Sequence, residues 1–130
     1  MIDDATQQAL FIDIHRDIHD VAAKTVARIP NAVGELVYPP NAEFTPAELT
    51  ALQHLQLSEA ARSALQKLVA EASSTIVFQF LSLLDGVADP TTGKFEPWLG
   101  VSLAVKPGED EPMLHDEFYD SYWNCRVVAG

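Results

Sequence analysis

Nearly every residue from Ile76 to Leu84 is apolar, and Gln79 and Ser82 are the two polar positions in that run. The run continues an apolar stripe with three- and four-residue spacing, which is the period of an α-helix. A helix that is apolar on nearly every side belongs in the interior of a domain. We therefore predict that 76–84 is the buried centre of the fold. A strand is the alternative for this run, because β-branched and aromatic residues are common in it.

Three further helices are expected around this segment. Apolar residues at helical spacing predict one helix that begins near Asp3 and ends before Pro30, a second begins at Thr45, and a last one runs from Pro112 to about Val127. Turn residues flank a loosely alternating segment near 95–105, which predicts a small β-strand or hairpin. The expected fold is a single α+β domain over 1–130, mainly α, with about four helices packed round a central apolar helix.

The charge balance narrows the range of partners. The chain has 19 acidic and 8 basic residues, a net charge of −11, and the basic residues are scattered singly. Nucleic-acid binding normally requires clustered lysine and arginine, so we expect a basic protein partner instead. The longest apolar run is too short to span a bilayer, and we expect no membrane association. A single cysteine, Cys125, and a start without a basic, apolar leader indicate the cytoplasm.

Two histidines suggest a metal site as an alternative function. His15 and His19 are four residues apart on the first predicted helix, so both imidazoles could face one ion. A third ligand would have to come from elsewhere, and His115 lies in the one other suitable cluster. Histidines at the edge of an amphipathic helix also occur without any metal, and we favour that structural role and expect no cofactor.

The end of the apolar helix carries an acidic loop. Asp85 lies at the negative end of the helix dipole, Gly86 suits a left-handed C-terminal cap, and Asp89 follows in a turn-rich segment. We predict that Asp85, Gly86 and Asp89 organise the loop through hydrogen bonds to backbone amides. A carboxylate pair for acid–base chemistry or cation binding is the alternative.

The most suggestive stretch for function is acidic and aromatic. Six acidic residues and no lysine or arginine lie between Glu109 and Asp120, interleaved with aromatic side chains. Carboxylates steer a basic partner, and aromatic rings supply large contact areas at low entropic cost. The predicted partner-binding residues are Asp116, Glu117, Tyr119, Asp120 and Trp123. The same aromatic face could also serve self-association, and its rings could instead belong to the core.

Parts of the C-terminal half resemble small acidic bacterial proteins. The resemblance is carried by the segment Phe80–Pro90 (FLSLLDGVADP), by Trp98 and by the later run Leu114–Tyr119. Some such proteins are similar in size and acidity to immunity-type proteins of polymorphic toxin systems. The resemblance covers the C-terminal half and implies a stoichiometric inhibitor rather than a catalyst. It assigns no catalytic residue to this chain.

Known catalytic motifs are missing from the sequence: no serine lies in a Gly-x-Ser-x-Gly elbow, and there is no glycine-rich phosphate loop. The sequence therefore favours a non-enzymatic, cytoplasmic protein-binding domain. The more specific prediction is an immunity-type inhibitor. The alternative is a small metal-dependent enzyme or metal-binding protein that uses His15 and His19.

Overall fold

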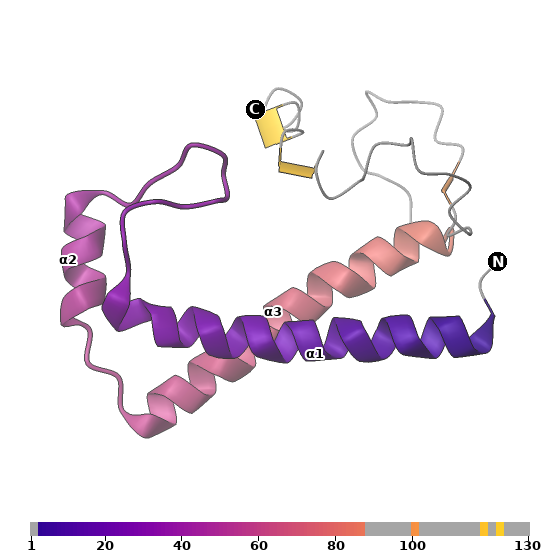
Figure 1. Cartoon of the computed structure of the whole chain (residues 1–130), viewed down its shortest axis with the longest axis horizontal. Coiled ribbons are helices and arrows are strands. Elements are labelled where there is room, and N and C mark those ends of the chain that lie inside the picture. Colours follow the sequence, from indigo (N-terminus) through magenta and orange to yellow (C-terminus); the bar gives the residue numbers. More distant parts are fainter. Residues whose placement is uncertain (1–2, 88–99, 102–117, 120–121, 124–130) are drawn as a thin grey trace.

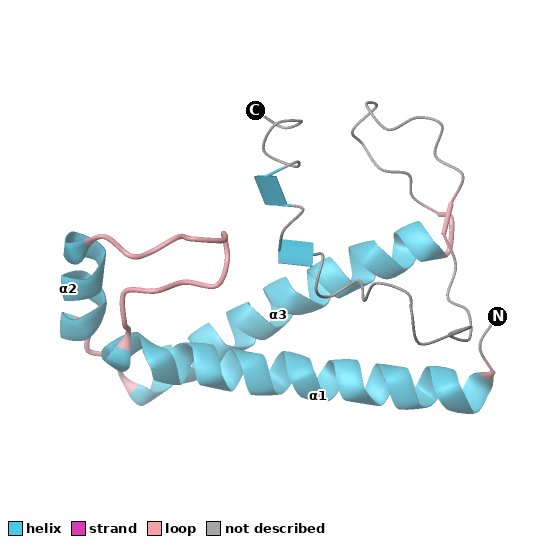
Figure 2. Cartoon of the chain, turned by 45° about the horizontal axis from the view of Figure 1, so that its top comes forward, coloured by secondary structure: helices cyan, strands magenta, loops and turns pink. Residues whose placement is uncertain are grey.

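The computed structural model describes residues 3–87, 100–101, 118–119 and 122–123. The helices in this part of the chain are α1 (Asp4–Arg28), the short 3-10 helix η1 (Ile29–Asn31), α2 (Pro46–His54) and α3 (Glu59–Leu84). In both Figure 1 and Figure 2, α1 and α3 run in opposite directions and diverge toward the N-terminus of α1 and the C-terminus of α3. The short α2 lies beyond the other end of α1. The described part is therefore mainly helical, as predicted.

Local chemistry fixes where each helix begins. The Asp3 carboxylate accepts a hydrogen bond from the Thr6 amide at 2.8 Å, and the Ser58 hydroxyl accepts one from the Ala61 amide at 3.1 Å. Thr45 and Glu48 form a reciprocal capping box, with the Glu48 amide donating to Thr45 Oγ1 at 3.2 Å and the Thr45 amide donating to Glu48 Oε1 at 3.1 Å. These bonds satisfy amides that have no partner within the helix. The predicted starts at Asp3 and Thr45 are confirmed.

The caps make stability depend on pH. Hydrogen bonds from the Thr6 amide and hydroxyl hold the pKa of Asp3 below its ordinary value of 3.8. Bonds from the Thr45 amide and hydroxyl hold the pKa of Glu48 below 4.5. A lowered folded-state pKa contributes stability above the ordinary value, and that stability is lost as the pH falls through the folded-state pKa.

We therefore expect thermal melts followed by circular dichroism to show a loss of stability as the pH falls below about 5. Replacement of both acids, as Asp3→Ala with Glu48→Ala, should lower stability at neutral pH and flatten this dependence. An unchanged acid slope in the double variant would contradict the assignment to these two carboxylates.

The core of the described part is small and lies mainly along one side of α1. Its buried side chains are Ile18, Ala22 and Val26 of α1, with Ala32 just after η1. Val21 and Thr25 lie at helical spacing from Ile18, yet both are exposed. The buried side of α1 therefore runs through Ile18, Ala22 and Val26. The small side chain of Ala22 allows the axes of α1 and α3 to approach closely.

The predicted burial of 76–84 is wrong for this structure. The segment is helical, as favoured, but no residue of α3 is fully buried, and Ile76 is 66% exposed. The reason is that α1 packs on the face of α3 that carries Ala70, Val77 and Leu81. The larger apolar residues on the other sides of α3 consequently lie outside the contact, and α3 is a flanking helix rather than a central one.

Length and composition alone would also allow α3 to cross a membrane. The sequence prediction of no membrane span considered only the unbroken run 76–84, whereas apolar residues are frequent over a longer part of this helix.

A Schellman motif ends α3 at the predicted glycine. Gly86 has a φ of 73°, its amide donates to the Leu83 carbonyl at 3.3 Å, and the Val87 amide donates to the Ser82 carbonyl at 3.1 Å. This pair of bonds satisfies carbonyls at the end of the helix and requires a left-handed residue between them. The predicted cap at Gly86 is confirmed.

Gly86→Ala should lower the free energy of unfolding by about 1 kcal/mol, because an L side chain is disfavoured at this φ. Open space surrounds the position, so steric contact adds nothing to the cost. Gly34→Ala is the matched control, since its added methyl group meets only Leu49 Cδ1 at 4.0 Å and its φ is not positive. Urea titration of both variants measures the difference, and equal effects would contradict the conformational explanation.

Several sequence predictions concern residues outside the described part. The strand or hairpin near 95–105 falls almost entirely there, and Gly100 and Val101, which are described, are not in a strand. Of the predicted last helix, residues 118–119 and 122–123 are described and helical. The described residues contain no strand, and their one isolated β-bridge joins Glu35 and Glu43. The prediction of one domain over 1–130 stays a prediction.

Candidate functional site

The loop between η1 and α2 is held to the end of α1. The Phe44 amide donates to the Gly34 carbonyl at 2.8 Å, which ties the two arms of the loop together. The Arg28 guanidinium donates to the Glu35 carbonyl at 3.1 Å and lies 5.7 Å from the centre of the Phe44 ring. An arginine that both donates a hydrogen bond and faces an aromatic ring fixes the base of the loop.

A tight turn at the far end of the loop presents Tyr38. The Leu36 amide donates to the Ala42 carbonyl, and the Ala42 amide donates to the Pro39 carbonyl, each at 3.0 Å. Asn41 has a φ of 63° at the turn position where asparagine or glycine is favoured. The turn leaves the Tyr38 ring exposed.

Three rings from the C-terminal part gather round Tyr38, and a fourth packs against one of these three. The centre of the Tyr38 ring lies 5.1 Å from Tyr122, 6.1 Å from Tyr119 and 6.4 Å from Phe118. Tyr122 is in turn 5.2 Å from Trp123, nearly edge to face. These separations are typical of favourable aromatic pairs. We call these five residues, Tyr38, Phe118, Tyr119, Tyr122 and Trp123, the aromatic cluster.

The aromatic cluster is packed internally yet open to solvent. Tyr38, Phe118, Tyr119 and Trp123 are exposed, and Tyr122 is partly buried. Of the predicted partner-binding residues, the structure places Tyr119 and Trp123 in this cluster, whereas Asp116, Glu117 and Asp120 lie outside the described residues. Sequence analysis missed Tyr38. The Pro39-Pro40-Asn41 turn that follows Tyr38 was the one local signal that its ring would be presented at a loop tip.

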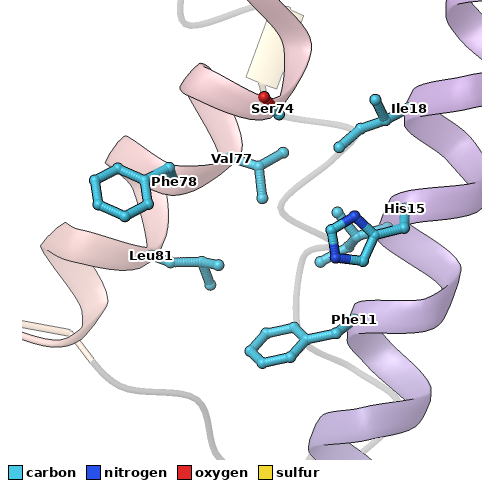
Figure 3. A pocket seen from close by; sticks show the side chains of 8 residues that line it. Phe11, His15, Ile18, Ser74, Val77, Phe78 and Leu81 are labelled. Atoms are coloured by element: carbon cyan, nitrogen blue, oxygen red, sulfur yellow. The ribbon is translucent and has the colours of Figure 1, made fainter. Parts of the chain in front are cut away.

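A groove, separate from the aromatic cluster, lies where α1 and α3 diverge. It is an open, largely apolar groove of about 330 Å³. Figure 3 shows Phe11 pointing from α1 toward α3, and Val77 and Leu81 pointing from α3 toward α1. The ring of Phe78 points away from α1 in the same view, in keeping with its exposure. The groove follows directly from the divergence of the two helices.

The two candidate metal ligands on α1 are exposed and line different hollows. His15 borders the groove with Phe11, whereas His19 borders a smaller hollow beside Ala70. Within the described part of the chain, no group of three potential ligands is close enough to hold an ion. His115, the predicted third ligand, falls outside that part.

Asp85 caps α3 through its backbone. Its amide donates to the Leu81 carbonyl at 2.8 Å, and its side chain is exposed. This main-chain bond belongs to the helix itself, and the predicted loop-organising role of Asp85 stays a prediction. The predicted bonds of the Asp85 carboxylate to the loop and the role of Asp89 concern a segment beyond the described residues.

Comparison with protein-family models, with curated proteins and with solved structures gives no match for this chain. The site must therefore be interpreted from its own residues.

Proposed function

We propose that this chain is a cytoplasmic, non-enzymatic protein-binding domain that contacts a basic partner through the aromatic cluster. The observation that carries the proposal is the group of five rings, four of them exposed, that joins the loop after η1 to helical residues near the C-terminus. Tyrosine and tryptophan are enriched among the residues that dominate binding energy at protein interfaces.

Charge supports a basic partner. The chain carries a net charge of −11, and Asp116, Glu117 and Asp120 lie next to the rings in the sequence. On the loop itself, the exposed Glu35 and Glu43 face each other across the β-bridge near Tyr38. Complementary charge accelerates encounter, and the rings then supply contact area.

The test is a pull-down of the full chain from its native cell extract, run at about 50 mM and about 500 mM salt, because added salt screens exposed charges. We expect one basic protein to be retained at low salt and released at high salt. The purified partner is then titrated against Tyr38→Ala, which should weaken binding by about 30-fold, the effect of losing a strong interface residue.

Two controls make this test specific. Phe78→Ala removes an exposed ring far along the sequence from the cluster and should leave affinity unchanged. Reversal of Asp116, Glu117 and Asp120 to lysine should abolish the salt-sensitive part of binding. Unchanged partner affinity in the charge-reversed chain, or an equal loss in Phe78→Ala, would overturn the proposed surface.

The finer form of the proposal is a stoichiometric, immunity-type inhibitor, and it rests on the resemblance of the C-terminal half. It predicts a one-to-one complex in which the activity of the partner is lost. Sedimentation of the complex and an assay of the partner distinguish an inhibitor from a neutral binding module.

A further inference from the structure

A row of exposed apolar residues runs along the side of α3 that α1 leaves uncovered. Leu68, Ala72, Ile76 and Phe80 recur every four residues, and all four are exposed. Leu68 is 59% and Phe80 is 52% exposed. Residues at this spacing form a ridge, the feature that interlocks with the grooves of another helix in the commonest class of helix packing. We call these four residues the outer ridge.

Three hydroxyls near the outer ridge are already bonded within α3 itself. The hydroxyls of Ser73, Thr75 and Ser82 donate to carbonyls of the preceding turn at 2.8–3.0 Å. A partner can therefore cover this side of the helix without leaving these hydroxyls unpaired, which would otherwise cost free energy.

Charge indicates what the partner is. From Ala60 to Leu84 the helix has one acidic residue, Glu71, and two basic residues, Arg62 and Lys67, whereas the whole chain has 19 acidic residues. A basic protein would gain nothing from this surface. Two copies of a chain with a charge of −11 repel each other, and they can approach most closely where acidic side chains are absent.

We propose that the outer ridge is the surface through which two copies of this chain associate. A two-fold contact places the same patch on both copies, and the small Ala72 near the middle of the ridge allows close approach of the two α3 helices. Standard interfaces use about 20–30 residues from each partner, more than one side of a 26-residue helix provides. The dimer is therefore expected to be weak, with a dissociation constant well above about 1 µM.

Sedimentation equilibrium of the full chain from about 1 to about 500 µM tests the proposal. We expect the mean mass to rise from that of one chain to that of two chains over this range. Added salt screens the repulsion between the two copies, so the rise should then begin at a lower protein concentration. Ile76→Glu should keep the chain monomeric throughout. Phe78→Glu is the matched control, because it makes the same change at a 72% exposed residue about 200° round the same helix, and it should still dimerise.

Circular dichroism of both variants should retain the helical signal, since both side chains are exposed. A monomer at every concentration would overturn the proposal, as would dimers equally weakened by both variants. The full chain is also mixed with neutral and anionic lipid vesicles. Vesicle binding that Ile76→Glu abolishes, without any dimer in solution, would assign the outer ridge to a membrane and likewise overturn it. The negative chain makes binding to anionic vesicles unfavourable.

Discussion

Val26→Asp is expected to unfold the chain. Val26 is 2% exposed, on the buried side of α1. A carboxylate there would have no basic partner, because the described core consists of Ile18, Ala22, Val26 and Ala32. An uncompensated buried charge costs about 3–5 kcal/mol, and a small core leaves little stability to lose. Far-ultraviolet circular dichroism and urea titration at neutral pH should show a largely unfolded variant.

Val21→Asp is the matched control. It makes the same substitution on the same helix, but Val21 is 51% exposed. A surface substitution of this kind changes stability by about 0.5 kcal/mol or less. Equal loss of stability in the two variants would contradict the orientation of α1 described above.

Ala22→Leu is expected to have the second largest effect. Ala22 is buried where α1 approaches α3, and it borders the hollow that also contacts Ala70. A larger side chain would force the helices apart or into strained rotamers, at a cost of about 1–3 kcal/mol. Thermal and urea unfolding measure this loss.

The neighbouring Ala23→Leu provides the comparison, because Ala23 is exposed on α1 and leucine is also a good helix former. Its stability should stay close to that of the unmodified chain. If Ala22→Leu were as stable as Ala23→Leu, the close approach of α1 and α3 at this position would be wrong.

Helix ends were the part of the fold that could be predicted from sequence. Asp3, Thr45 and Gly86 act through atoms within a few residues of themselves, and Pro30 lies just beyond the end of α1. Short-range hydrogen bonds and backbone restrictions require no knowledge of the rest of the chain. The helix through 76–84 was correctly favoured because its apolar stripe repeats at helical spacing, which is also a property of one segment.

Burial could not be predicted in the same way. Apolarity shows that a side chain gains from being covered, but not which neighbour covers it. Val21 and Val26 are chemically identical and lie on one helix, yet only Val26 is buried. The apolar run of Ile76, Phe78 and Phe80 indicated a central helix, whereas α1 packs on a side of α3 with smaller residues. Tertiary contacts between distant segments decided both outcomes.

In the candidate site, too, the features that depend on one segment could be predicted, and those that depend on contacts between distant segments could not. Tyr119 and Trp123 were predicted from acidic and aromatic composition, which is a property of one short stretch. Tyr38 joins them from a loop far away in the sequence, and no periodicity links the two segments. The predicted helical pair of histidines does lie on α1, but His15 and His19 border different hollows. Spacing alone could not indicate where their side chains would lie.

Thiol reactivity tests the central packing claim most directly. In a Cys125→Ser background, Ala22→Cys and Ile76→Cys each introduce a single thiol. The rate at which each thiol reacts is measured with a disulfide reagent that releases a coloured product. The protein concentration is about 1 µM, where the proposed dimer is dissociated. The thiol at position 76 should react nearly as fast as it does in urea, because Ile76 is 66% exposed. The thiol at position 22 should react at least about 100-fold more slowly, because it requires local opening of the α1–α3 contact. A protected thiol at 76 together with a reactive one at 22 would contradict the account.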